Sequence, residues 1–143
     1  MTLKNALPAL QDLLGKRLST LTGDLLQHGK SESHWRGPPP EAVAYPQTTA
    51  EVAAIARLAT EWRFAMTAWG AGTSLEGHAL ALTGGVVVDF REMAAVLEIR
   101  PEDRLVRVQP GITREALNLE LRTSGLMFPV DPGANASLGG MAA

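Results

Sequence analysis

The sequence contains no cysteine, which excludes disulfide bonds, thiolate metal ligands and cysteine nucleophiles. Its three histidines lie far apart and form no H-x-x-x-H pair, so we expect no metal site. No apolar run reaches the length of about 18 residues that a membrane span needs. The N-terminus lacks the continuous apolar core of a signal peptide. These absences predict a cytoplasmic protein, with any membrane association made through partners.

Charge of either sign is also in short supply. The 143 residues carry 13 basic and 15 acidic side chains, a formal net charge of −2, with no block of like charges. This balance excludes nucleic acid as an expected partner and gives no attraction to an anionic membrane surface. A hydrophobic content of 45% in a chain of this length is typical of one ordinary globular domain.

Three segments have the periodicity of helices. Leucines recur at helical spacing from residue 3 to residue 18, with a break at Gly15. A second helix is predicted over Thr49–Trp62, because Thr48 and Glu51 have the spacing of a capping box. A third is predicted from a cap at Thr113 to about Ser124, with Gly125 as its stop.

Apolar and alternating runs predict the strands. The segments are Phe64–Trp69, Gly84–Phe90, and a hairpin formed by Val96–Arg100 and Arg104–Gln109. The last stretch, from residue 126 onward, has the prolines and glycines of a loop. This order of elements predicts an α/β (α+β) fold, a small mixed sheet with helices packed on it, and not an alternating doubly wound sheet.

The stretch "SESHWRGPPP", residues 31–40, is predicted to be a loop because three consecutive prolines cannot lie inside a helix. We therefore divide the chain into an N-terminal helical segment with a proline-rich linker, residues 1–40, and a second unit, residues 41–143. The chain stops at "NASLGGMAA", inside a glycine-rich stretch, and we expect it to be the incomplete N-terminal part of a larger domain.

The stretch "MTAWGAGTSLEGHAL", residues 66–80, has three glycines within eight residues. The dinucleotide fingerprint G-x-G-x-x-G fails here because Leu75 stands at its third glycine and no helix is predicted to follow. The nucleotide-binding P-loop fails because His78 and Ala79 replace its lysine and hydroxyl residue. Two interpretations stay open: an anion-binding nest of backbone N–H groups, helped by the hydroxyls of Thr73 and Ser74, or a plain tight turn.

Three ordered motifs favour the first interpretation. "WGAGTSLEGH", "VQPG" and "FPVDPGANASLGGMAA", together with "PEAVAYPQTTAEVAAIARLA" before them, resemble the N-terminal part of an FAD-linked oxidase domain of the vanillyl-alcohol-oxidase type, also called the PCMH fold. Within that family the motifs are most similar to the branch of D-lactate dehydrogenases and glycolate oxidase D subunits. The resemblance covers the chain from about residue 41 to its last residue.

The resemblance implies a set of FAD-binding residues. The first glycine loop, residues 69–77, would wrap the pyrophosphate through Trp69, Gly70, Ala71, Gly72, Thr73, Ser74, Leu75 and Gly77. The second glycine loop, residues 132–140, would pass along the diphosphate, the ribityl chain and the flavin edge through Pro132, Gly133, Ala136, Ser137, Gly139 and Gly140. Pro110 and Gly111 would shape the wall between the loops. Relatives that bind flavin covalently from this first loop have histidine where Thr73 stands, so the resemblance implies noncovalent FAD.

Other polar residues near these motifs are expected to have structural roles. We expect His78 to bond a backbone carbonyl and Glu76 to orient the first glycine loop. Asp89 and Arg91 are expected to pair with neighbours, and Asp131 to fix the turn before Pro132. No catalytic base is identified.

The resemblance thus implies an FAD-dependent oxidoreductase of small 2-hydroxy acids, with D-lactate or glycolate as substrate. As partners we expect the remaining FAD and cap domains of the complete enzyme, without which this chain is expected to be inactive. A surface left uncovered would promote self-association. The alternative is a non-catalytic α/β interaction module that binds no flavin.

Overall fold

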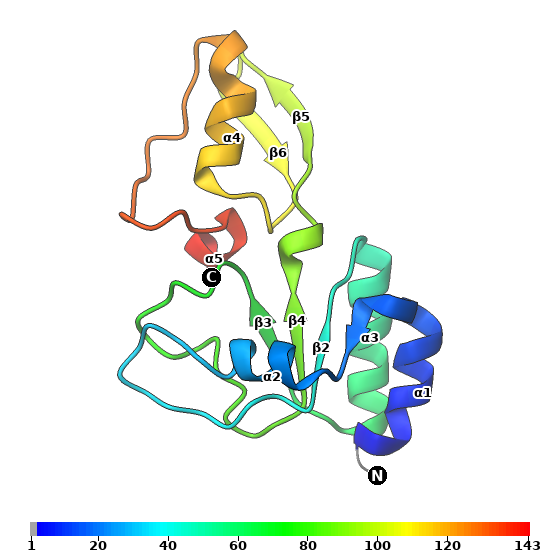
Figure 1. Ribbon diagram of the computed structural model, residues 1–143. Coiled ribbons are helices and arrows are strands. Elements are labelled where there is room, and N and C mark those ends of the chain that lie inside the picture. The colour runs from blue at the N-terminus through cyan, green and yellow to red at the C-terminus, as the bar shows by residue number, and fades with distance from the viewer. Residues whose placement is uncertain (1–2) are drawn as a thin grey trace.

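The computed structural model describes residues 3–143, and Figure 1 shows their arrangement. The elements in chain order are α1 (Leu3–Leu14), a 3₁₀ turn (Gly15–Arg17), β1 (Leu18–Ser19), α2 (Thr22–His28), β2 (Ala42–Ala44), α3 (Thr49–Trp62), β3 (Met66–Trp69), β4 (Val86–Asp89), a 3₁₀ turn (Phe90–Glu92), β5 (Val96–Arg100), β6 (Leu105–Val108), α4 (Arg114–Leu121), a 3₁₀ turn (Arg122–Ser124) and α5 (Leu138–Ala142).

The main sheet is mixed, with the strand order β1-β2-β4-β3. β4 lies between β2 and β3 and is parallel to both, and β1 is antiparallel to β2 at the edge. Because the three parallel strands run the same way, β3 and β4 end at the same edge of the sheet, where Trp69 is paired with Asp89. The predicted small mixed sheet is confirmed.

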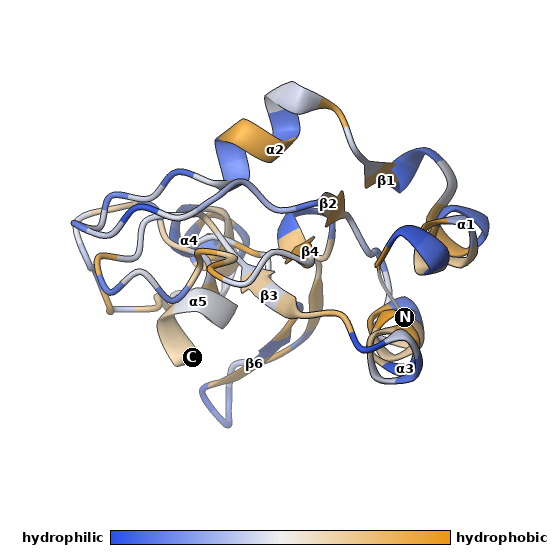
Figure 2. Cartoon of the chain, turned by 90° about the horizontal axis from the view of Figure 1, so that it is seen from below, coloured by the Kyte–Doolittle hydropathy of each residue, from blue (hydrophilic) through white to orange (hydrophobic). Residues whose placement is uncertain are grey.

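The centre of this sheet is buried on both faces. Ala42, Ala44, Val86 and Val88 share one core with α1 and α3, whereas Val43 and Val87 face a second core with Leu25 of α2 and the segment 79–81. Figure 2 shows α2 and α3 on opposite sides of the strands. Burial on both faces explains the unbroken run of three valines, since strands covered by helices on both sides carry no polar alternation.

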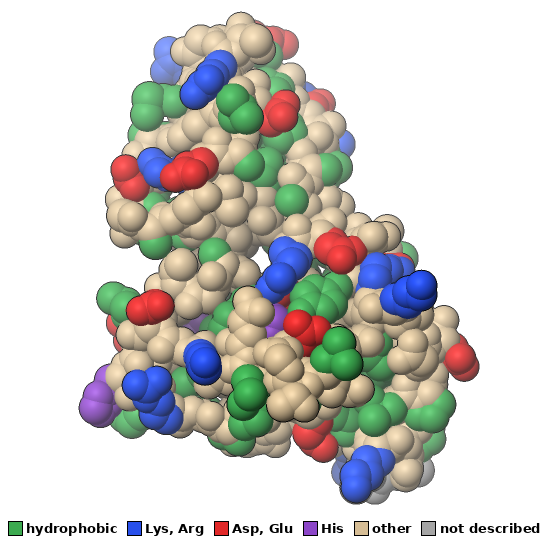
Figure 3. Space-filling view, in the orientation of Figure 1, with side chains coloured by type: hydrophobic (Ala, Val, Ile, Leu, Met, Phe, Trp, Pro, Cys, Tyr) green, Lys and Arg blue, Asp and Glu red, His purple; other side chains and the backbone are tan. Residues whose placement is uncertain are grey.

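A second, smaller unit follows β4. β5 and β6 form an antiparallel hairpin, and α4 packs its Leu117 and Leu121 against that hairpin together with Ile112. In Figure 1 this unit lies at the far end of the molecule from α1 and α3, and the outline in Figure 3 is indented between the two parts. The hairpin is therefore a separate sheet and not an extension of the main one.

The predicted helices and strands are found with shifts of a few residues at their ends. α3 spans the predicted residues, and the hydroxyl of Thr48 accepts from the backbone N–H of Glu51 at 3.2 Å, as the capping box requires. α1 stops at Leu14, and Gly15 has a φ of +56°, which explains the break there. α4 is followed by Gly125 in the left-handed region, φ +69°, as predicted for a stop.

Four of the α-helices and strands were not predicted: β1, α2, β2 and α5. The strands have only two and three residues, too short for a recognisable alternation. The expectation of a loop throughout the last stretch was wrong at α5, whose two adjacent glycines indicate a loop by propensity. This helix forms because the hydroxyl of Ser137 caps it and because Gly139 N–H donates to the carbonyl of Pro110 at 2.8 Å.

The N-terminal segment belongs to the same core as the main sheet. Leu3, Ala6 and Leu10 of α1 are buried against the sheet, and β1 pairs with β2 across residue 40. Within residues 3–143, no helix combines the length and apolarity needed to cross a membrane.

Candidate functional site

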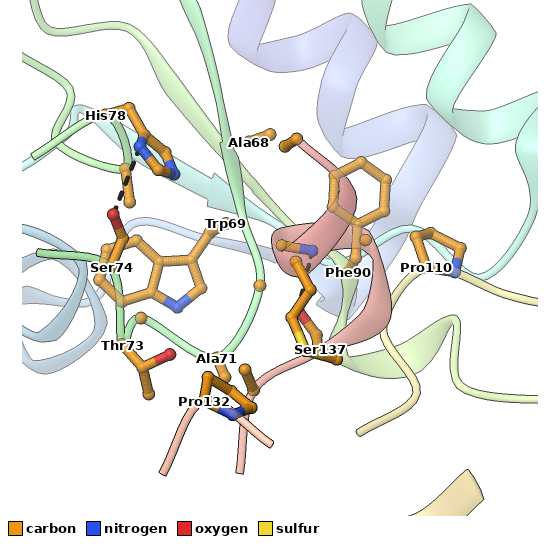
Figure 4. A pocket seen from close by; sticks show the side chains of 18 of the residues that line it. Ala68, Trp69, Ala71, Thr73, Ser74, His78, Phe90, Pro110, Pro132 and Ser137 are labelled. Carbon is orange, nitrogen blue, oxygen red and sulfur yellow. Dashed lines mark hydrogen bonds between the residues drawn. The ribbon is translucent and has the colours of Figure 1, made fainter. Parts of the chain in front are cut away.

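A cavity of about 510 Å³ lies beyond the carboxyl ends of β3 and β4, within the size range of small-molecule sites. Crevices at this edge of parallel strands are common ligand sites in α/β proteins. The two glycine loops meet there, and Figure 4 shows side chains from both around the cavity. Its wall is formed by Ala68, Trp69, Gly70, Ala71, Gly72, Thr73, Ser74, His78, Ala79, Phe90, Pro110, Val130, Pro132, Ala136, Ser137, Gly139, Gly140, Met141 and Ala143.

The glycines let the two loops touch each other and their supports. A Cβ atom on Gly70 would overlap the hydroxyl of Ser137, and one on Gly139 would lie 2.7 Å from Cβ of Pro110. At Gly72, where φ is +73°, a Cβ would come within 2.5 Å of the Trp69 ring. The absence of side chains at these three positions is therefore required first by protein packing, in addition to any approach of a ligand.

The loops differ in the hydrogen-bond donors that they leave free. Among residues 3–143, the backbone N–H groups of residues 71–74 have no hydrogen-bond acceptor in the protein. In the second glycine loop, by contrast, Leu138 N–H donates to Ile112, Gly139 N–H to Pro110, and Gly140 N–H to the hydroxyl of Ser137. The first glycine loop is therefore the part of the wall that can offer a row of main-chain donors to an anion.

The polar side chains of the wall are few: three hydroxyls, of Thr73, Ser74 and Ser137, and the ring of His78. Ser74 Oγ lies 3.3 Å from Nδ1 of His78. In the part of the chain that the structure describes, no lysine, arginine, aspartate or glutamate lines the cavity. The expected bond from His78 to a backbone carbonyl was wrong, since its ring bonds the hydroxyl of Ser74 and lines the cavity.

Twelve of the sixteen predicted cofactor residues line this cavity, and four do not. Leu75 is 69% exposed and points elsewhere. Gly77 lies against the indole of Trp35, where a Cβ atom on the glycine would be 2.9 Å from Cδ1 of the ring. Gly111 is packed onto the carbonyl of Phe90. Gly133 has a φ of +82° in a turn where its N–H donates to Asp131. The structure gives the three glycines a backbone or packing role and leaves Leu75 exposed, and the contact of all four with a cofactor stays a prediction.

The wall also contains residues that the motifs did not identify. Phe90 and Ala68 come from the ends of the parallel strands, and Val130 and Met141 flank the second glycine loop. They are ordinary apolar residues in the sequence, and only the shared edge of β3 and β4 could have indicated Ala68 and Phe90. The expectation for Asp131 is confirmed, because its carboxylate accepts from Gly133 N–H at 3.1 Å.

A buried ionic cluster lies at the end of β4, next to Trp69. Asp89 is fully buried; its carboxylate accepts from Nε2 of His28 at 2.8 Å and from Nε of Arg91 at 2.8 Å. Burial alone raises the pKa of Asp89, but the hydrogen bonds from His28 and Arg91 outweigh burial, so the pKa lies below its ordinary value. Asp89 and Arg91 thus pair with neighbours, as predicted. Sequence reasoning missed His28, because the carboxylate that it contacts, that of Asp89, is 61 residues away in the sequence.

The site can therefore bind a large anionic ligand through backbone N–H groups and hydroxyls. Free main-chain N–H groups, three hydroxyls and an apolar wall suit a diphosphate joined to an aromatic group, and FAD has this composition. Among the described residues, no group of three or more His, Asp or Glu side chains is placed to hold a metal ion. The residues present fit FAD.

Solved structures share this fold. An alkyldihydroxyacetonephosphate synthase structure superposes with a TM-score of 0.88 at 20% identity, over 98% of this chain and 29% of that one. A p-cresol methylhydroxylase structure superposes with a TM-score of 0.75 at 19% identity, over 87% of this chain and 25% of that one. At this level of identity the likeness concerns the fold, which is that of PCMH-type FAD-binding proteins.

Curated relatives are similar in sequence as well. The probable mitochondrial D-lactate dehydrogenase of Danio rerio is 49% identical over 117 residues, 82% of this chain and 24% of that protein. The mitochondrial D-lactate dehydrogenase (cytochrome) of Arabidopsis thaliana is 37% identical over 142 residues, which are 98% of this chain and 25% of that protein. The D-2-hydroxyglutarate dehydrogenase of Escherichia coli is 41% identical over 108 residues, which are 71% of this chain and 10% of that protein. The chain thus spans about a quarter of the first two relatives.

The sequence model of one family matches most of the chain. It is described as FAD binding domain, and it matches residues 40–143, which include both glycine loops and every residue of the cavity wall. This match, the PCMH-type fold and the donor-rich first glycine loop agree with one another. The chain therefore belongs to the FAD binding domain family, and its cofactor is FAD.

Proposed function

We propose that this chain is the part of a flavin-dependent D-2-hydroxy-acid dehydrogenase that holds the diphosphate of FAD. The observation that carries the proposal is the set of unbonded N–H groups of residues 71–74 in the cavity wall. Relatives named D-lactate and D-2-hydroxyglutarate dehydrogenases support the substrate class. When bound, FAD supplies the chemistry of two-electron oxidation, and the protein supplies binding and orientation.

The residues have separate proposed tasks. The N–H groups of residues 71–74 and the hydroxyls of Thr73 and Ser74 hold the phosphate oxygens. Trp69, which lies against Gly72, and Ser137, which lies against Gly70, set the spacing of the two glycine loops. Thr73 has a hydroxyl and no ring nitrogen to attach flavin, so we propose that the cofactor is bound noncovalently.

The substrate site is proposed to come from other parts of the complete enzyme. A 2-hydroxy acid carries a carboxylate, and such groups are bound by cationic side chains. No lysine or arginine of the described residues reaches the cavity wall. We propose that the FAD and cap regions beyond this quarter of the relatives' length close the site and bind the acid.

Among the substrates, we propose D-lactate first and glycolate second. D-lactate is favoured because it stands in the names of the Danio rerio and Arabidopsis thaliana relatives, which are 49% and 37% identical over 82% and 98% of this chain. The alternative of an interaction module without flavin is not favoured by any observation on this site. The cytoplasmic location expected from the sequence stays a prediction, since the relatives include mitochondrial proteins.

The test uses the complete purified enzyme. The apoprotein is titrated with FAD, and the bound flavin is then mixed anaerobically with D-lactate, D-2-hydroxyglutarate, glycolate and, as control, L-lactate. Bleaching of the flavin absorption by D-lactate and not by L-lactate is expected. An enzyme that takes up no FAD would contradict the cofactor role, and flavin reduced only by an unrelated donor would contradict the substrate class.

A further inference from the structure

We propose that His28 is a positioning residue for the first glycine loop and that it acts through Trp69. The inference rests on the function proposed above, because its readout is the affinity for FAD. His28 belongs to α2, ahead of the region 40–143 that the family model matches. Nothing in the family match therefore assigns it a role.

The ring of His28 is fixed at both nitrogens. Nδ1 lies 2.8 Å from the carbonyl oxygen of Asp24, and Nε2 lies 2.8 Å from the carboxylate of Asp89. The carbonyl can only accept, and Asp89 is already an acceptor for the side chain and the backbone N–H of Arg91. Both ring nitrogens lie within hydrogen-bond distance of an oxygen atom. Two opposed hydrogen bonds in a fully buried site leave the ring no freedom to turn.

The fixed ring lies against Trp69. The two ring centroids are 4.8 Å apart with an interplanar angle of 57°, a tilted contact within the range of favourable aromatic pairs. Trp69 is also paired with Asp89 in the register of β3 and β4. His28 thus contacts the indole directly and also bonds the residue beside it in the sheet.

Trp69 in turn supports the first glycine loop. Its ring lies under Gly72, close enough that a Cβ there would come within 2.5 Å of Cζ2. Trp69 and Gly72 both line the cavity, and the unbonded N–H groups belong to residues 71–74. A rotation of the indole would therefore displace the donors that we assign to the phosphates.

The segment after α2 meets the same loop from outside. The hydroxyl of Ser31 donates to the carbonyl of Ser74 at 3.3 Å, and the indole of Trp35 lies against Gly77. In Figure 1 the loop that follows α2 lies beside the loop that follows β3. The N-terminal segment therefore supports the first glycine loop at three points, through His28, Ser31 and Trp35. Of these residues, only His28 is fully buried and hydrogen-bonded to a carboxylate.

A double-mutant cycle in the complete enzyme tests the path through Trp69. The variants are His28→Phe, Trp69→Leu and the pair, with the dissociation constant of FAD measured on each apoprotein. We expect His28→Phe to weaken FAD binding about tenfold alone, and less than about twofold further in the Trp69→Leu background, because coupled residues are not additive. His28→Gln, whose amide can donate to Asp89 but has no ring to contact Trp69, is expected to weaken FAD binding about as much as His28→Phe.

Hydrogen exchange adds a readout that a general loss of stability does not give. His28→Phe is expected to speed exchange of the peptide 66–79 and to leave α1 and α3 unchanged. Glu51→Gln, which breaks an ion pair away from the cavity, serves as control and is expected to leave FAD affinity unchanged. If His28→Phe does not fold, Asp89→Asn replaces it in the same cycle.

Two results would overturn the inference. One is an FAD affinity of His28→Phe, or of Asp89→Asn in its place, within twofold of wild type. The other is an effect of His28→Phe as large with Trp69→Leu as without it. A wild-type enzyme that binds no FAD would instead overturn the proposed function.

Discussion

The indole of Trp69 lies so close beneath Gly72 that a Cβ atom at this glycine would be 2.5 Å from Cζ2 of the ring. This contact changes the meaning of the glycine. The resemblance to FAD-linked oxidases implies that glycine leaves space for a pyrophosphate, whereas the structure shows that Trp69 occupies the position that a side chain would need. Both demands act on one residue, and the packing demand can be tested without a ligand.

Gly72→Val is expected to abolish FAD binding, with at least a hundredfold loss of affinity in the complete enzyme. The added side chain must displace Trp69, and the φ of +73° disfavours a β-branched residue. Strain of this kind costs about 1–3 kcal/mol in the free energy of unfolding. FAD titration and chemical unfolding measure the two effects.

Gly15→Ala is the matched control for backbone strain. Gly15 also has a positive φ, +56°, but a Cβ there would meet nothing within 4 Å, and it lies outside the cavity wall. We expect a loss of stability with FAD affinity unchanged. Retention of flavin by Gly72→Val would show that the first glycine loop is assigned wrongly.

FAD is expected to leave the protein on denaturation. Thr73 offers no ring nitrogen for a flavin bond, and Nδ1 of His78 is engaged by the hydroxyl of Ser74. Acid precipitation of the complete enzyme should place all the flavin in the supernatant. A fluorescent band that stays with the protein on a denaturing gel would contradict this, and His78→Ala would then identify the point of attachment.

Glu51 is expected to make stability depend on pH below about 4.5. Its hydrogen bonds from Arg17, at 2.6 and 2.7 Å, lower the pKa of the carboxyl from 4.5 to about 2. A lowered pKa in the folded state stabilises the protein above pH 4.5, and this stabilisation is lost as the pH falls toward 2. Glu51→Gln should cost about 0.5–1 kcal/mol at pH 7, since the pair is partly exposed.

Denaturant unfolding of wild type and Glu51→Gln between pH 7 and pH 3 checks this. The difference in free energy should shrink as the pH falls. A difference that stays constant over this range would show that Glu51 acts through packing or helix capping and not through its charge.

Asn118 is expected to hold the segment that leads into the second glycine loop. Its side chain donates to the carbonyl of Phe128 at 3.1 Å and accepts from the N–H of Phe128 at 2.7 Å. Asn118→Ala leaves both backbone groups without this partner and should lower the free energy of unfolding by about 1–3 kcal/mol. Leu119→Ala, at an exposed neighbour, should change it by less than about 0.5 kcal/mol. Equal effects would contradict the role of Asn118.

Self-association of the isolated chain is expected to arise from an apolar groove of about 450 Å³ beside the cavity. Val108, Phe128, Val130, Leu138 and Met141 line it. Apolar surface of this kind favours association. Sedimentation over a range of concentrations should show oligomers, which Val130→Lys weakens and Met127→Lys, at an exposed residue outside the groove, does not. A monomer at all concentrations would contradict this expectation.

Local chemistry made much of the fold predictable. The hydroxyl and carboxylate of the capping box determined the start of α3, and the turn residues 101–104 separated the two strands of the hairpin. The motifs also identified most of the cavity wall, because they carry the glycines that close loop packing requires.

The rest depends on contacts between distant residues. β2 is a strand because Ala42–Ala44 fit beside β4, and α5 is a helix because Ile112 and Pro110 accept its first N–H groups. The pairing of His28 with Asp89 joins residues 61 positions apart. No local pattern in the sequence encodes such a pair.

The central position of β4 has a consequence for how related chains can differ in length. One inserted residue in Val86–Val88 would turn each following side chain to the opposite layer, break the pairing with both neighbours and move Asp89 away from His28. Evolution can therefore lengthen or shorten this protein at exposed connections such as residues 101–104, but not in the strand that both layers share.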